Sequence, residues 1–377
     1  MASPIGLYIH VPFCLRKCPY CDFYSVIMDD SLADAYCDAL VRAIHHCGRH
    51  NVRTIYFGGG TPSLPGANRL ARLMRTIRGY FHVTSYPEAT IEANPAADTD
   101  FAALRRAGFN RVSVGVQSCV DSELQALGRL HTADEAIKTI ERAAFEGFDD
   151  ISADLMLAIP GQTEETLVHS IKTITELPIR HISAYLLKIE DGTPFARQNI
   201  AAKCPGEDET ARLYLRCVEY LAQQRFDQYE ISNFGKRFWK GNAVSYHNLG
   251  YWNCGEYLGL GPAAHSFLNG RRFFFPRDLE SFIDAENPLT LTVDDGPGGG
   301  FEEYAMLRLR LVAGLDLPLC AKAFGENINT EAIAQKARSL ERNRLLSLKD
   351  GVISLTPEGF LLSNAVTAEL LSPVTAL

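Results

Sequence analysis

Short apolar runs alternate with longer amphipathic stretches over the first half of the chain. The apolar runs predict buried strands at 7–11, 54–57, 90–93, 111–116, 151–155 and 181–186. A helical period between them predicts helices at 31–47, 65–80, 98–107, 132–146 and 163–176. Two of these helices carry start signals, because Thr132 precedes Glu135 and Thr163 precedes Thr166.

This alternation predicts the fold class. Strands that alternate with helices need right-handed crossovers, which build a parallel sheet covered by helices. The six strand–helix units fall short of the eight that close a barrel. The segment 1–195 is therefore predicted to be α/β, a partial (β/α)6 barrel of the TIM type.

The pattern changes beyond residue 195. One helix is predicted at 207–224, and the stretch 229–267 is rich in aromatics, glycine and asparagine with little periodicity. The acidic and glycine-rich segment 294–300 is a loop by composition. We therefore expect an extension at 196–295 that ends at this loop.

The last part of the chain has a third pattern. Helices are predicted at 302–314 and 330–343, and an Asp-Gly turn within 345–355 indicates a β-hairpin. This order predicts an α+β, winged-helix-like region over 296–377.

Charge and composition limit the classes of function that this chain could have. The chain has 377 residues, 46% of them hydrophobic and 22% charged, with a net charge of -8. An acidic chain argues against a nucleic-acid partner, although a DNA-binding regulator built on the winged region stays an alternative. The chain shows no apolar run that could span a bilayer and no secretion signal at its start, so we expect it in the cytoplasm.

Three of the ten cysteines crowd into eight residues with the spacing C-x3-C-x2-C. Cys14, Cys18 and Cys21 suit an iron–sulfur cluster, since cysteine thiolates are its usual ligands. A zinc site is the alternative, but zinc ordinarily takes four ligands and no second cysteine pair is present. The spacing predicts a [4Fe–4S] cluster with one iron that no cysteine binds.

A glycine-rich segment, GGGTP at 58–62, follows the second predicted strand. Together with the cysteine spacing it resembles the radical S-adenosylmethionine (SAM) superfamily, in which the open iron binds SAM. The resemblance assigns SAM or cluster contacts to Tyr8, Tyr20, Gly59, Gly60, Thr61, Glu92, Gln117, Arg129 and Asp154. A structural hydrogen-bonding role is the alternative for the polar residues at the strand ends.

The segment YIHVPF ahead of the cysteines resembles the coproporphyrinogen dehydrogenase-like branch of that superfamily. Two subfamilies compete: the oxygen-independent coproporphyrinogen III dehydrogenases (HemN) and the HemW heme chaperones. The dehydrogenases have a longer leading segment and a further cysteine where this chain has Phe23. The segment 247–252, HNLGYW, matches the HNxxYW signature of HemW. The resemblance therefore favours the chaperone and argues against the dehydrogenase activity.

His247 is the heme-iron ligand that this signature implies. Imidazole is a common axial ligand, and Tyr251 and Trp252 suit a porphyrin face. Ordinary core packing of the three residues is the alternative. Cys254 and His265 are secondary candidates for the iron, and the residues that suit the propionates are Arg271 and Arg272.

The resemblance implies a chaperone that binds a [4Fe–4S] cluster, SAM and heme. This chaperone would deliver heme to an acceptor protein, and membrane-associated proteins are among the candidate acceptors. It also implies a flavodoxin- or ferredoxin-like reducing partner, and either a monomer or a cluster-dependent homodimer. The alternative function is the anaerobic oxidative decarboxylation of coproporphyrinogen III, for which no catalytic residue is assigned.

Overall fold

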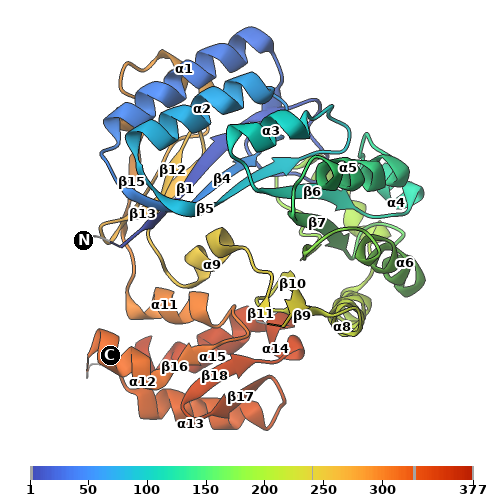
Figure 1. Ribbon diagram of the computed structural model, residues 1–377. Coiled ribbons are helices and arrows are strands. Elements are labelled where there is room, and N and C mark those ends of the chain that lie inside the picture. The colour runs from blue at the N-terminus through green and yellow to red at the C-terminus, as the bar shows by residue number, and fades with distance from the viewer. Residues whose placement is uncertain (1–2, 240, 326–327, 376–377) are drawn as a thin grey trace.

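The computed structural model describes residues 3–239, 241–325 and 328–375. Its centre is a run of parallel strands within a 13-stranded sheet. The run follows chain order: β1 (Ile5–Val11), β4 (Asn51–Gly59), β5 (His82–Ala93), β6 (Arg111–Gln117), β7 (Asp150–Leu157) and β8 (His181–Leu186). The sheet does not close on itself, which confirms the partial α/β barrel (Figure 1).

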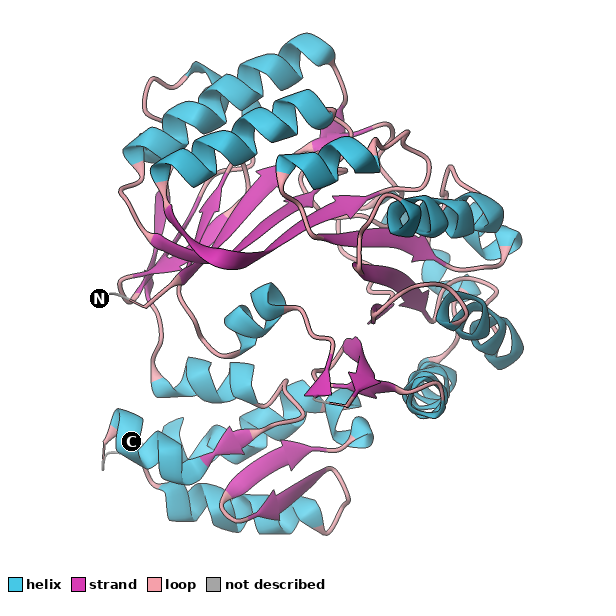
Figure 2. Ribbon diagram, viewed as in Figure 1, coloured by secondary structure: helices cyan, strands magenta, loops and turns pink. Residues whose placement is uncertain are grey.

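Helices cover the outer face of this run of strands (Figure 2). They are α1 (Asp30–His46), α2 (Ala67–Tyr80), α3 (Phe101–Ala107), α4 (Asp121–Ala126), α5 (Ala133–Phe145) and α6 (Glu164–Thr175). Both predicted starts are capping boxes, Thr132 with Glu135 and Thr163 with Thr166. The sequence did not predict α4, whose single short turn shows little periodicity.

The sheet continues past both ends of the parallel run. Beside β1 lies β12 (Tyr257–Leu260), parallel to it, and then the antiparallel strands β13 (His265–Leu268), β14 (Arg271–Phe274) and β15 (Val293–Pro297). Beside β8 lies β10 (Asn233–Phe238), which pairs with β9 (Phe226–Gln228) and β11 (Gly241–Asn242). None of these strands was predicted. They join the large sheet through β12, which pairs with β1, and through β10, which pairs with β8, and both pairings are distant in the chain.

The expectation of a loop over 294–300 was wrong for its first four residues. Val293–Pro297 forms β15, with Asp294 opposite Phe273 and Val293 opposite Phe274. The side chains of Asp294 and Arg271 also form an ion pair. Pairing with β14 overrides the loop-like composition, and an edge strand tolerates glycine and proline.

The segment 194–291 supplies mostly short elements around these strands. They are α7 (Pro194–Arg197), a 3-10 turn (Ile200–Lys203), the long α8 (Glu207–Gln223), α9 (Tyr246–Trp252), α10 (Leu279–Asp284) and a second 3-10 turn (Pro288–Leu291). The helix expected at 207–224 is α8. Helix α9 lies between the large sheet and the C-terminal region (Figure 1).

The C-terminal region has its own three-stranded sheet, in the order β16–β18–β17. Its elements are α11 (Phe301–Arg308), β16 (Leu315–Asp316), α12 (Leu317–Phe324), α13 (Thr330–Glu341), β17 (Leu346–Lys349), β18 (Val352–Leu355), α14 (Pro357–Leu361) and α15 (Ser363–Thr375). The predicted hairpin is confirmed. The helix expected at 302–314 ends at Arg308, because the chain turns there to enter β16.

The division into domains at 195 and 295 stays a prediction. None of the helices described is both long enough and apolar enough to cross a lipid bilayer.

Candidate functional site

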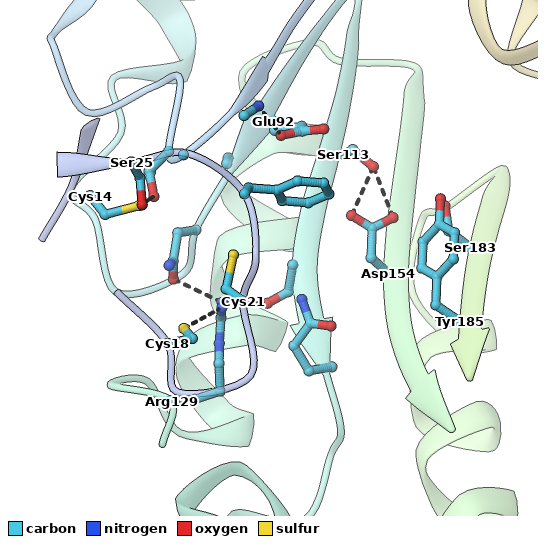
Figure 3. A pocket seen from close by; sticks show the side chains of 18 of the residues that line it. Cys14, Cys18, Cys21, Ser25, Glu92, Ser113, Arg129, Asp154, Ser183 and Tyr185 are labelled. Carbon is cyan, nitrogen blue, oxygen red and sulfur yellow. Dashed lines mark hydrogen bonds between the residues drawn. The ribbon is translucent and has the colours of Figure 1, made fainter. Parts of the chain in front are cut away.

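A cavity of about 420 Å³ opens where the parallel strands end (Figure 3). Its volume is within the usual range for small-molecule sites. Most of the residues assigned to the cluster and SAM line it together: Cys14, Cys18, Tyr20, Cys21, Gly59, Gly60, Thr61, Glu92, Gln117, Arg129 and Asp154. Residues at the ends of β4, β5, β6 and β7 thus meet the cysteine loop at one place, as expected for the carboxyl ends of a parallel barrel.

The three cysteines lie in a loop between two very short strands. Strands β2 (Phe13–Cys14) and β3 (Val26–Ile27) pair side by side and hold the two ends of this loop together. All ten cysteines, every one of which the structure describes, are free thiols. Among the described residues, no group of three metal-binding side chains is gathered closely enough to hold a metal ion.

The GGGTP segment holds the start of the cysteine loop. The Gly60 amide donates to the Val11 carbonyl at 2.9 Å, and the Thr61 amide donates to the Phe13 carbonyl at 2.7 Å. A Cβ on Gly60 would lie 2.6 Å from the Phe13 oxygen, so only glycine allows this approach. Gly59, Gly60 and Thr61 of this segment were expected to contact SAM or the cluster, and in the structure the segment also fixes the loop that carries the cysteines.

Arg129 places a cation beside the cysteine loop. Its guanidinium donates to the Cys18 sulfur at 3.5 Å, to Asn94 Oδ1 at 3.1 Å and to the Gly115 carbonyl at 3.0 Å. Its Nε atom is buried without a partner, and no described carboxylate forms an ion pair with it. A partly buried cation whose partners are all neutral suits an anionic ligand, such as a thiolate-bound cluster or a carboxylate.

Two carboxyl groups form the opposite side of the cavity. Glu92 accepts hydrogen bonds from the Tyr56 hydroxyl at 2.8 Å and the Gly59 amide at 3.2 Å. Asp154 accepts from the Ser113 hydroxyl at 2.9 Å. Burial raises the pKa of Glu92 to about 7, and it also raises the pKa of Asp154. These groups suit a ligand that carries positive charge and hydroxyls, which fits SAM.

Strand β6 also positions residues that the sequence did not identify, Arg111, Ser113 and Gly115, in addition to the predicted Gln117. Arg111, Ser113, Gly115 and Gln117 all line the cavity from β6, two residues apart. Gln117 has a φ of 68°, a conformation that is uncommon for residues other than glycine and that marks the strand end. The period of two along β6 was the signal that could have identified Arg111 and Ser113.

His247 lies outside this cavity. Only 3% of its surface is exposed, and both ring nitrogens already have partners. Nδ1 lies 2.8 Å from the Thr54 hydroxyl oxygen, and Nε2 lies 2.8 Å from the Tyr251 hydroxyl oxygen. The ring also stacks on Tyr56 at 5.0 Å, and burial lowers its pKa to about 3. In this conformation His247 offers no free nitrogen to iron.

The other residues of the HNLGYW segment face two different cavities. Asn248 lines the first cavity, whereas Tyr251 and Trp252 line a second one, together with Tyr8. Tyr8 lines this second cavity, and its ring also lies 6.2 Å from that of Tyr56, which lines the first one; its hydroxyl is hydrogen-bonded to His10 Nδ1 at 3.0 Å. Helix α9 itself is fixed by Glu88, whose carboxylate accepts from the amides of Tyr246 and His247, each at 2.8 Å.

Comparison with known proteins shows the family of this chain. Residues 8–174 match the family model of the radical SAM superfamily, and residues 301–362 match that of the HemN C-terminal domain. The heme chaperone HemW of Lactococcus lactis is 33% identical over 386 residues, which cover 98% of each chain. The chain belongs to the HemW family of radical SAM proteins. The HemW of Bacillus subtilis is also 33% identical, over 95% of this chain and 97% of the relative.

A solved structure shows the same fold. The coproporphyrinogen III oxidase HemN of Escherichia coli, a radical SAM enzyme, superimposes with a TM-score of 0.81 over 97% of this chain and 90% of that chain. Its sequence identity is 20%, so the likeness concerns the fold and not the activity. The HemW relatives, in contrast, share a third of their residues with this chain over its whole length.

Proposed function

We propose that this protein is a heme chaperone that binds heme and delivers it to an acceptor protein. The observation that carries the proposal is the 33% identity to HemW of Lactococcus lactis over 98% of both chains. The HNLGYW segment supports it, since this segment builds the helix that directs aromatic side chains into the second cavity.

The first cavity would hold the [4Fe–4S] cluster and SAM. Cys14, Cys18 and Cys21 would bind the cluster, with Arg129 beside it, and Glu92 and Asp154 would face SAM across the cavity. When bound, a reduced cluster with SAM supplies an electron-transfer centre that can generate a radical. The residues of this chain position the two groups, exclude water and balance their charges.

The anaerobic decarboxylation of coproporphyrinogen III is the second candidate function. The shared fold with HemN favours it. Phe23 argues against the decarboxylation activity. Its side chain lines the first cavity at the position where the dehydrogenases carry a further cysteine.

The partners follow from the proposal. An acceptor apoprotein, in solution or at a membrane, takes the heme, and a flavodoxin- or ferredoxin-like protein reduces the cluster. The unpaired state of all ten cysteines supports a reducing compartment, the cytoplasm. The expected assembly is either a monomer or a homodimer that forms when the cluster is bound.

Titration of the anaerobically reconstituted protein with hemin tests the proposal. We expect a protein-bound Soret band that saturates at one heme per chain, and loss of this heme to an apo-hemoprotein added after gel filtration. A protein that takes up no heme, or that never releases it, would contradict the chaperone function.

A further inference from the structure

The cysteine loop is exposed on its outer side. Residues 15–17, between Cys14 and Cys18, all face solvent, and Leu15 is 46% exposed. The three cysteines themselves are only half-buried, and they lie on the side of the first cavity opposite Asp154 (Figure 3). A cluster bound by these thiols would therefore lie directly beneath an exposed stretch of chain.

Two further segments lie against this loop. The Phe195 amide of α7 donates to the Pro19 carbonyl at 3.1 Å. The Arg16 guanidinium donates to the Gly128 carbonyl at 2.6 Å, which holds the segment 128–131 against the loop. A Cβ on Gly128 would lie 2.8 Å from the Pro19 ring, so the contact between these two segments is close.

A small apolar cluster fixes the same three segments from beneath. Tyr20 of the cysteine loop packs against it, and its buried members are Leu127, Met156, Ile159, Phe195 and Ile200. The last two come from α7 and from the 3-10 turn that follows it. The outer sides of the three segments therefore belong to one continuous surface.

Cations dominate this surface. The segments 14–22, 128–131 and 188–204 together contain six lysines and arginines but only three carboxylates, although the whole chain has a net charge of -8. Two of the three carboxylates, those of Asp22 and Glu190, already form ion pairs with an arginine at 3.0 Å and a lysine at 2.7 Å, respectively. The surface above the cysteines is thus positive on an acidic protein.

Four of these cations and two leucines are exposed side by side around the cysteine loop. None of the four cations forms an ion pair with another residue that the structure describes. The two leucines are 46% and 51% exposed. We call this group the cationic face, and it consists of Leu15, Arg16, Lys17, Leu130, Arg197 and Lys203. Unpaired cations that cluster on one face attract an anionic partner from a distance.

We infer that the cationic face is the docking surface for a small acidic electron-transfer protein that reduces the cluster. The inference rests on the proposed function and names the surface at which its reducing partner binds. One electron leaves the donor and enters the oxidised cluster, which changes from the 2+ to the 1+ state, and no covalent bond forms. Complementary charges steer and orient the donor, and a small contact around Leu15 and Leu130 lets it leave after the transfer.

Charge reversal at Arg197 and Lys203 tests the docking surface without a change in the cysteine loop. The anaerobically reconstituted protein is mixed in a stopped-flow instrument with a reduced flavodoxin of net negative charge, and the loss of cluster absorbance is followed. In Arg197→Glu/Lys203→Glu we expect the second-order rate constant at low salt to fall at least about tenfold, because electrostatic steering changes association rates by that order. The difference from the wild type should shrink as the salt concentration rises.

Controls separate docking from other effects on the cluster. Lys322→Glu/Lys349→Glu makes the same change of charge on exposed lysines of the C-terminal region and should react like the wild type. Photoreduced deazariboflavin, a small uncharged reductant, should reduce the cluster of every variant at the same rate. A [2Fe–2S] ferredoxin of net negative charge is tested in parallel, and either donor supports the inference if only the reversal on the cationic face slows it.

Carbodiimide coupling gives a readout that does not depend on electron transfer. It joins lysine amines to carboxylates of the donor where the two proteins are in contact. We expect the cross-linked peptides, identified by mass spectrometry, to contain Lys17 or Lys203 and not Lys322 or Lys349, which are equally exposed.

Three results would overturn the inference. One is an unchanged rate with both donors in Arg197→Glu/Lys203→Glu, and another is cross-linking at the C-terminal lysines instead. The third is loss of a homodimer in this variant on gel filtration with unchanged reduction, since the face would then bind a second copy of the chain. A wild type that binds no hemin would instead overturn the proposed function, so the two failures are distinguishable.

Discussion

The replacement of His247 by alanine tests the structural role that the fold gives this residue. His247 connects α9 to β4, because its Nδ1 contacts the Thr54 hydroxyl, while its Nε2 contacts the Tyr251 hydroxyl one turn further along α9. Its ring also stacks on Tyr56 at 5.0 Å. Alanine removes all three interactions at a position where 3% of the residue surface is exposed.

The loss of stability in His247→Ala can be estimated from the hydroxyl groups that lose their hydrogen-bond partner and from the lost ring contact. A buried hydroxyl without a partner costs about 1–3 kcal/mol, and a lost aromatic stack costs about 0.5–1.5 kcal/mol. We therefore expect His247→Ala to lower the free energy of unfolding by about 3–5 kcal/mol. Thr54→Val removes one of the two hydrogen bonds and should cost about 1–2 kcal/mol.

Urea denaturation of the cluster-free protein, followed by circular dichroism, measures these differences. His265→Ala is the matched histidine variant and should change the stability by less than about 0.5 kcal/mol, since it removes an exposed side chain. A loss below about 1 kcal/mol in His247→Ala would refute the reasoning, because the two hydrogen bonds would then not stabilise the fold.

Three further predictions concern the first cavity and helix α9. Cys14→Ser should lose most of the roughly four iron atoms per chain that the wild type takes up under anaerobic reconstitution, whereas Cys204→Ser, outside the cavity, should keep them in an iron and sulfide assay. The pKa of Glu92 is about 7, so its carboxyl loses its charge as the pH falls below that value. Binding of cationic SAM should therefore weaken by up to about tenfold from pH 7 to pH 6 in equilibrium dialysis. Glu92→Gln should make the affinity for SAM less dependent on pH. A wild type whose affinity does not change with pH would contradict this role of Glu92. Glu88→Gln removes the carboxylate charge that accepts from the first two amides of α9 and should cost about 1 kcal/mol in denaturation. Unchanged stability would contradict this role.

The parallel core of the fold could be predicted because its signals are local. Each of its strands is an apolar run. Two of its helices begin at Thr132 and Thr163, and each of these caps pairs with a side chain only three residues later. Strand β15 could not be predicted, because its acidic and glycine-rich segment becomes a strand only through pairing with β14. Helix α9 has one local and one distant determinant: its N-cap Ser245 is adjacent, but Glu88, which also accepts from the Tyr246 amide, lies 158 residues earlier.

Part of the candidate site could also be predicted from the sequence. Most of the residues at the strand ends, such as Glu92 and Asp154, converge because the topology of a parallel sheet brings its carboxyl ends together. The partners of His247 could not be read from the sequence: Tyr251 is one turn away, but Thr54 is 193 residues away. The sequence also could not separate Arg271 from Arg272, since the strand that turns them to opposite sides was not predicted.

One paired measurement tests the central claim most directly. A single anaerobically reconstituted sample, with cluster and SAM present, is titrated with hemin and assayed in parallel for conversion of coproporphyrinogen III to protoporphyrinogen IX. The account predicts saturable binding of one heme per chain and no porphyrinogen product. Product formation coupled to SAM consumption, without stable heme binding, would contradict it.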